Sequence, residues 1–185
     1  MNVPQDSGYL EIILGPMFSG KTNRLIHLKK MYTLCDLSVC VVNYDKDTRY
    51  HETMLSTHDK QMIDCIRTDN LRSLLDTVDT YDVYLINEIQ FFTEIYDVIQ
   101  QLVDMHSKIV HICGLDGTFE RKEFHREVAE LIPLADDVVK LSSICKLCKK
   151  KACFSKRIGN SQEKVMVGGE ELYIPVCRKC YLNGN

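Results

Sequence analysis

The chain has 185 residues, of which 45% are hydrophobic, which suits one globular core with a small appendage. Its net charge of −3 does not by itself suggest a nucleic-acid-binding protein, and no run of about 18 apolar residues predicts a membrane span. The polar N-terminus lacks a secretory signature, so the nine cysteines indicate reduced thiols or metal ligands in a cytoplasmic protein.

The first third of the chain predicts two strands and one helix. Residues 9–14 form an apolar strand, and residues 23–34 carry apolar side chains at helical spacing. Residues 38–44 are rich in β-branched side chains and predict a second strand. The polar residues 45–60 that follow predict a loop.

The middle of the chain continues this pattern after the loop. Residues 61–68 predict a third strand, and Asp69 is placed to cap a short helix over residues 70–78. Residues 81–88 predict a fourth strand.

Thr93 is expected to cap a helix over residues 94–106, and residues 108–115 predict a fifth strand. Alternating strands and helices predict right-handed βαβ units, and therefore an α/β fold with a parallel sheet flanked by helices. Ligands of such sheets bind beyond the carboxyl ends of the strands, so functional residues are expected after residues 14, 44, 88 and 115.

The segment between the first strand and the first helix matches the phosphate-loop pattern G-x-x-x-x-G-K-[ST]. Its residues are Gly15, Pro16, Met17, Phe18, Ser19, Gly20, Lys21 and Thr22. Glycine lets successive backbone N–H groups point at a phosphate, and the helix N-terminus adds partial positive charge. The lysine supplies a cation for the β- and γ-phosphates and the threonine a hydroxyl ligand for Mg²⁺. The alternative is a glycine-rich turn, and the motif indicates a nucleoside triphosphate without fixing the reaction.

Two further candidate groups lie at the carboxyl ends of other strands. Asn87-Glu88 ends the fourth strand, and Glu88 can act as a metal helper or as a general base, unless it is an ordinary strand-end glutamate. Asp45, Asp47 and Arg49 follow the second strand and offer carboxylates for Mg²⁺ and a guanidinium for phosphate. A solvated charged loop is the competing interpretation of this second group.

The composition changes near residue 140, where long helical patterns give way to cysteines and lysines. This change predicts a nucleotide-binding domain over residues 1–140 and a small zinc-binding domain over residues 141–185. Two C-x-x-C pairs, Cys145 with Cys148 and Cys177 with Cys180, match a closed tetrahedral Zn²⁺ site. Unrelated free thiols or a redox pair are the alternatives. Zinc at both ends would close residues 149–176 into a loop able to fold over a ligand.

The charge distribution leaves two functions open. Residues 140–185 hold 10 Lys and Arg against 3 Asp and Glu, so this tail either is a solvated surface or faces an anion. One hypothesis is a small-molecule kinase with a phosphate loop, a base and a lid. The other is a zinc-ribbon nucleic-acid-binding NTPase, although the chain lacks room for a second motor domain and the tail lacks a run of aromatics for base stacking.

Eight segments together resemble the type II thymidine kinases, from about residue 9 to residue 182. In chain order they are ILGPMFSGKT, KDTRY, THDK, QFF, LDGTFERKEF, PLADDVVKL, CFSKRIG and VCRKCY. The resemblance implies a P-loop α/β domain with a zinc-anchored lasso over the nucleoside. It also implies transfer of the ATP γ-phosphoryl group to the 5′-hydroxyl of thymidine, a homotetramer, and inhibition by dTTP. No nucleic acid or membrane partner is implied.

The resemblance also assigns roles to particular residues. Glu88 becomes the general base. The residues assigned to ATP and Mg²⁺ are those of the phosphate loop, 15–22, together with Asp47, Thr48, Arg49, Asn87 and Gln90. The residues assigned to thymidine are Phe119, Phe124, Lys164, Val165, Met166, Val167, Gly168 and Tyr173, with Phe119 against the thymine ring and 164–168 using their backbone. Zn²⁺ is assigned to the four paired cysteines. Two positions depart from the usual family pattern, because Asn87 replaces an aspartate and Ile89 replaces a glycine.

Overall fold

The computed structural model of the chain describes residues 7–46, 54–56, 62–158 and 172–183. Its centre is a sheet of six parallel strands in the order β5-β2-β6-β7-β1-β8. The strands are β1 (Tyr9–Leu14), β2 (Val39–Tyr44), β5 (Ile66–Thr68), β6 (Val83–Ile86), β7 (Ile109–Gly114) and β8 (Asp137–Lys140). The predicted α/β fold class is therefore confirmed.

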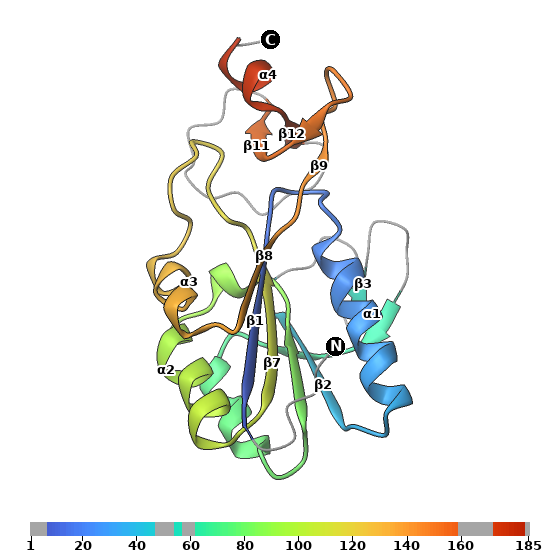
Figure 1. Ribbon diagram of the computed structural model, residues 1–185, viewed down its shortest axis with the longest axis vertical. Helices are drawn as coiled ribbons and strands as arrows, with labels where there is room; N and C mark the ends of the chain where they lie inside the picture. The colour runs from blue at the N-terminus through green and yellow to red at the C-terminus, as the bar shows by residue number, and fades with distance from the viewer. Residues whose placement is uncertain (1–6, 47–53, 57–61, 159–171, 184–185) are drawn as a thin grey trace.

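Helices cover both faces of this sheet (Figure 1). Helix α1 (Lys21–Leu34) packs on one face. The other face carries the 3₁₀ helix η1 (Leu71–Thr77), α2 (Ile95–Gln100) with its π-helical continuation η3 (Gln101–Met105), and α3 (Arg126–Glu130). Two short 3₁₀ turns, η2 (Ile89–Phe91) and η4 (Ile132–Leu134), complete this part of the chain. Within the described residues, no helix combines the length and apolar character needed to cross a membrane.

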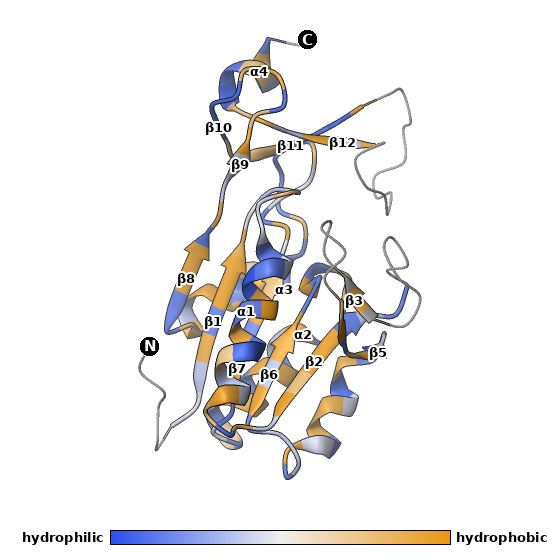
Figure 2. Cartoon of the chain, turned by 90° about the vertical axis from the view of Figure 1, so that its right-hand side faces the viewer, coloured by the Kyte–Doolittle hydropathy of each residue, from blue (hydrophilic) through white to orange (hydrophobic). Residues whose placement is uncertain are grey.

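The central strands are largely hydrophobic along their length, as the colours of β1, β2 and β6 show in Figure 2, which suits a sheet covered on both faces. In β1, Leu10 and Ile12 point toward the α2 side, whereas Ile13 points toward α1. All three side chains are fully buried. Burial on both sides holds the register of the central strands and so fixes where each strand ends.

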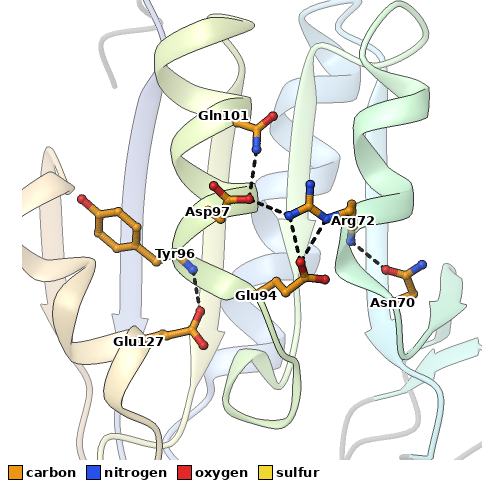
Figure 3. A network of polar contacts seen from close by, with 7 residues as sticks. All are labelled: Asn70, Arg72, Glu94, Tyr96, Asp97, Gln101 and Glu127. Atoms are coloured by element: carbon orange, nitrogen blue, oxygen red, sulfur yellow. Dashed lines mark hydrogen bonds and ion pairs between the residues drawn. The ribbon is translucent and has the colours of Figure 1, made fainter.

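The helices on the α2 face are tied together by polar contacts (Figure 3). Arg72 of η1 donates hydrogen bonds to Glu94 Oε1 at 2.8 Å and to Asp97 Oδ2 at 2.6 Å. The backbone N–H of Tyr96 donates to Glu127 Oε2 at 2.9 Å and so joins α2 to α3. These groups lie near the surface, so they orient the helices more than they stabilise the fold.

Both predicted helix caps are wrong by one residue. Asn70, and not Asp69, caps η1, because its side-chain oxygen accepts a hydrogen bond from the Arg72 N–H at 3.1 Å. The residue before α2 is Glu94, in the left-handed region with a φ of 54°, so Thr93 lies one position too early. The predicted helix over residues 94–106 is also not uniform, since its second half is π-helical.

The segment predicted as a loop over residues 45–60 contains a short strand. Strand β3 (Met54–Ser56) pairs in antiparallel fashion with β4 (Met62–Asp64), so the strand predicted over residues 61–68 is divided into β4 and β5. Leu55 explains this, because its side chain is 1% exposed and packs with the apolar residues on the α1 face.

The chain leaves the sheet at Lys140 and forms a small unit above the carboxyl ends of the strands (Figure 1). We call residues 143–158 and 172–183 the cysteine module. It comprises β9 (Ser143–Ile144), β10 (Lys151–Ala152), β11 (Phe154–Arg157), β12 (Tyr173–Val176) and α4 (Arg178–Leu182). It has its own small core around Cys145, Ala152 and Val176. The division into two domains near residue 140 stays a prediction.

One buried ionic network joins α1 to the sheet. Glu11 of β1 is 4% exposed and contacts His111 Nδ1 at 2.7 Å and the guanidinium of Arg24. The other ring nitrogen of His111 is 2.8 Å from the hydroxyl of Tyr32, which is also buried. Burial alone would raise the pKa of Glu11, but His111 and Arg24 outweigh it and hold this pKa below its ordinary value. The network therefore anchors the helix that begins at Lys21.

The first prediction is that Glu11→Gln lowers the free energy of unfolding by about 2 kcal/mol at pH 7, since it removes the carboxylate that the buried His111 and the half-buried Arg24 both contact. Because the folded-state pKa is lowered, the stabilisation is fully present above the ordinary value of about 4.3. It is lost as the pH falls through the folded-state pKa. Urea unfolding from pH 7 downward should show the difference narrowing below about pH 4. The exposed Glu130→Gln is the control, and an equal loss there would refute the assignment.

Candidate active site and cysteine centre

The predicted phosphate loop connects β1 to α1 at the carboxyl edge of the sheet. Gly20 has a left-handed φ of 84° and precedes α1 without a side-chain cap. A Cβ atom on Gly15 would lie 2.8 Å from Ser19 Oγ and 2.9 Å from the Leu141 carbonyl oxygen. Both glycines of the motif are therefore required by the backbone, the first by close approach and the second by conformation.

The loop has the groups that a phosphate needs. Lys21 Nζ donates hydrogen bonds to the carbonyl oxygens of Gly15 at 3.1 Å and Pro16 at 2.8 Å. The Ser19 hydroxyl is buried without a hydrogen-bond partner among the described residues. Thr22 lies in the first turn of α1, whose N-terminus carries partial positive charge. These residues fit the phosphates of a nucleotide, which would satisfy the buried hydroxyl.

A cavity of about 560 Å³ opens beside the loop. The phosphate loop forms one wall, and Ser142 with the start of the cysteine module forms the other. The lining residues are Phe18, Ser19, Gly20, Ser142, Ser143, Ile144 and Lys151. Its volume lies within the range of small-molecule sites, about 300–1,000 Å³.

Glu88 follows β6 at the same edge of the sheet. Its φ of 54° is left-handed, a conformation that costs a non-glycine residue about 1–2 kcal/mol. Gln90 Nε2 donates a hydrogen bond to Glu88 Oε2 at 2.5 Å, and Gln90 Oε1 accepts one from the Leu115 N–H at 3.1 Å. The buried Gln90 therefore holds the carboxylate against the end of β7. Strained backbone at a strand end is typical of functional sites.

Asn87 directly follows β6, and its side chain lies on the side of the sheet that faces α1. Its side chain is 3% exposed, its Nδ2 donates to Asn43 Oδ1 at 2.8 Å, and its Oδ1 accepts from Cys113 Sγ at 3.0 Å. Burial raises the pKa of the Cys113 thiol to about 12, while the charges of Glu88 and Lys21 act on it in opposite directions. The charges of Glu88 and Lys21 therefore both act on a thiol near the carboxyl end of β7.

The two predicted base-pocket phenylalanines lie in different surroundings. Phe124 contacts Phe91 edge to face, with ring centroids 5.6 Å apart, and Phe91 stacks on Tyr44 at 5.4 Å. Phe119 instead lies under the cysteine module, where the Arg157 guanidinium is 4.0 Å from its ring centroid. Arg157 Nη2 also donates a hydrogen bond to the hydroxyl of Tyr173 at 2.7 Å. Phe119 and Tyr173 are therefore brought together through Arg157.

Several predicted residues lie outside the described part of the chain. They are Asp47, Thr48 and Arg49 of the charged loop, and Lys164, Val165, Met166, Val167 and Gly168 of the lasso. Their assignments stay predictions.

The four paired cysteines form one cluster. The sulfur atoms of Cys145, Cys148, Cys177 and Cys180 all lie within 4.8 Å of one another, and this is the one such group among the residues that the structure describes. Zn–S bonds of about 2.3 Å in a tetrahedron place sulfurs about 3.8 Å apart, so the cluster fits zinc. Burial alone would raise the pKa of Cys145, but backbone N–H groups outweigh it and lower this pKa, which favours the thiolate.

Sequence analysis missed some residues at this edge. Asn43 and Cys113 looked like ordinary strand residues, and only the strand register brings them to Asn87. Asp116, whose carboxylate is 2.6 Å from Lys140 Nζ, joins the loop after β7 to the end of β8. Arg157 and Tyr181 lie within the segments CFSKRIG and VCRKCY. Their contacts with Phe119 could not be read from these segments, because they join parts of the chain that are far apart in sequence.

Comparisons with known proteins agree with this geometry. The family model described as thymidine kinase matches residues 8–181. The chain is 43% identical to the thymidine kinase of Sheeppox virus (strain KS-1), over 95% of this chain and 98% of that protein. It is 42% identical to the thymidine kinase of Raccoon poxvirus and 39% identical to that of Vaccinia virus (strain Western Reserve), each over 96% of this chain and 99% of the relative.

The second prediction is that the purified chain binds one zinc ion per molecule through the four-cysteine cluster. Cys145→Ser should lower zinc affinity at least about tenfold, because a serine hydroxyl is a poor replacement for a thiolate ligand. Atomic absorption after dialysis measures this. Cys153→Ser is the matched control, since Cys153 lies in the same module but outside the cluster. Full zinc retention by Cys145→Ser would contradict the assignment.

Proposed function

The chain belongs to the thymidine kinase family, and we propose that it transfers the γ-phosphoryl group of ATP to the 5′-hydroxyl of thymidine. The products are dTMP and ADP. The observation that carries this proposal is the family match over residues 8–181, which includes the phosphate loop, Glu88 and all four clustered cysteines. The alternative of a nucleic-acid-binding NTPase is not favoured, because the three relatives compared above are thymidine kinases over nearly their full length.

The phosphate loop holds the donor. The N-terminus of α1 and the loop's backbone N–H groups, except that of Met17, face the phosphates, and the Ser19 hydroxyl gains a partner there. The ammonium group of Lys21 contacts the β- and γ-phosphates and offsets their negative charge. Bound Mg²⁺ would neutralise the charge between these phosphates, held by Thr22 and Asp47, with Asn87 nearby. We also assign Thr48 and Arg49 to the donor side.

Glu88 acts on the acceptor. Its carboxylate accepts the proton of the 5′-hydroxyl as that oxygen bonds to the γ-phosphorus, and the bond from this phosphorus to the β–γ bridging oxygen breaks. Gln90 keeps the carboxylate in place through its hydrogen bond. The strained backbone of Glu88 supports this role, since positions of this kind are retained where function requires them.

Residues beneath the cysteine module and in the lasso hold the nucleoside. Phe119 contacts one face of the thymine ring, with Phe124 and Tyr173 beside it, and the backbone of residues 164–168 pairs with the polar edge of the base. A wrong base would leave these backbone groups unpaired, which rejects it more strongly than shape alone. Zinc would hold both ends of this lasso together.

We also propose the oligomeric state, the regulation, the partners and the location of the enzyme. It forms a homotetramer, is inhibited by dTTP, and takes no nucleic acid or membrane as partner. We place it in the cytoplasm. The basic charge of the cysteine module then serves nucleotide binding and subunit contacts.

The experiment that tests the function is ADP release with ATP and Mg²⁺ and a panel of acceptors. Thymidine should give the highest kcat/KM among the common nucleosides. Single-stranded DNA should stimulate no ADP release. Stimulation by the polynucleotide and none by thymidine would contradict the kinase assignment.

The third prediction concerns Glu88. Glu88→Gln should lower kcat by at least about 100-fold, because an amide cannot accept the hydroxyl proton, while ATP affinity stays within about twofold. Kinetics and calorimetric ATP titration measure the two effects separately. Parent-like turnover would exclude Glu88 as the base.

The fourth prediction concerns Lys21. Lys21→Ala should lower kcat/KM by at least about 100-fold, or about 3 kcal/mol, with the fold intact by circular dichroism. Lys30→Ala is the control, because that lysine is exposed on α1 and lies outside the loop. Near-normal turnover by Lys21→Ala would exclude the phosphate-loop role.

A further inference from the structure

Arg157 occupies a central position between two rings of the nucleoside side. It lies at the end of β11, its guanidinium carbon is 4.0 Å from the Phe119 ring centroid and 5.3 Å from that of Tyr173, and it donates to the Tyr173 hydroxyl at 2.7 Å. A guanidinium at this distance from a ring centroid is held by cation–π attraction. The side chain therefore fixes the Phe119 ring relative to Tyr173 of β12.

The main chain of Phe119 is fixed by a second residue of the same module. The Tyr181 hydroxyl donates a hydrogen bond to the Phe119 carbonyl oxygen at 2.7 Å. Tyr181 follows the clustered Cys180 directly, and the Arg121 guanidinium lies 4.3 Å from its ring centroid. The segment that rises from β7 toward the module (Figure 1) is thus held at both backbone and ring.

The same strand also reaches the phosphate loop. The Ser155 hydroxyl, two residues before Arg157 and on the same side of β11, accepts a hydrogen bond from the Met17 N–H at 3.0 Å. Ser155 is 7% exposed, so this contact is shielded from water. One strand therefore contacts the donor loop through Ser155 and the base-binding ring through Arg157.

We propose that Arg157 and Tyr181 are positioning residues for the nucleoside, which set the ring and the backbone of Phe119 from the cysteine module. This inference rests on the proposed function, because it needs Phe119 to contact the thymine ring. The inference gives the four-cysteine cluster a role in nucleoside binding although the cysteines do not contact the nucleoside themselves. The cysteines hold α4 and the β11–β12 hairpin, and these two elements carry the residues that hold Phe119.

The test compares steady-state kinetics of Arg157→Gln, Arg157→Lys and Tyr181→Phe with the parent. Arg157→Gln should raise KM for thymidine about tenfold, with kcat and the KM for ATP within about twofold. Arg157→Lys should recover part of the loss, because lysine keeps the charge but not the planar face. Tyr181→Phe removes only the hydroxyl and should raise KM for thymidine about threefold.

Arg126→Gln is the matched control, since that arginine is exposed and contacts Glu130 instead of the rings. Zinc content near one per chain shows that a variant keeps the module, and Tyr181→Phe decides the question if Arg157→Gln loses its zinc. Unchanged KM for thymidine in zinc-loaded variants would overturn the inference. A lowered KM would also overturn it, because the guanidinium would then occupy the place of the base. A parent enzyme inactive on thymidine would instead refute the proposed function.

Discussion

The parallel register of the sheet is the constraint on which the rest of the structure depends. Because β1, β6 and β7 run side by side in one direction, their carboxyl ends bring the phosphate loop, Glu88 and the segment leading to Phe119 to one edge. Each of these segments is polar or strained, and each depends on the buried strand that precedes it for its position. The network of Glu11, His111 and Arg24 also fixes the position of α1 relative to the sheet, and the first turn of α1 completes the phosphate loop.

The cysteine module lies beyond the carboxyl ends of the strands and covers this edge of the sheet (Figure 1). It contacts the α/β part through Ser155 on the phosphate loop and through Arg157 and Tyr181 on residue 119. Phosphoryl transfer requires mainly positioning and charge neutralisation, so small shifts of either substrate are costly. A module closed by four cysteines can supply such rigidity with a core of few residues.

The sequence was most informative where chemistry is local. The phosphate loop, the strand ends and the paired cysteines each depend on spacing within a short segment. The loop connects β1 to α1 and the four cysteines form one cluster, as expected, whereas Asp47 and Arg49 at the end of β2 lie outside the described residues. Caps and short strands were predicted less well, because a shift of one residue separates Asp69 from Asn70 and the burial of Leu55 is a tertiary effect. The contacts of Asn43, Arg157 and Tyr181 could not be predicted, since their partners are distant in sequence.

The most direct measurement of the central claim is a crystal structure with thymidine and a non-hydrolysable ATP analogue. The 5′-hydroxyl should lie about 3 Å from a carboxylate oxygen of Glu88 and in line with the γ-phosphorus. The triphosphate should lie along residues 15–22, and the thymine ring should lie against the face of Phe119 opposite Arg157. Thymidine bound away from the carboxyl edge of the sheet, or with its 5′-hydroxyl pointing away from Glu88, would contradict the account.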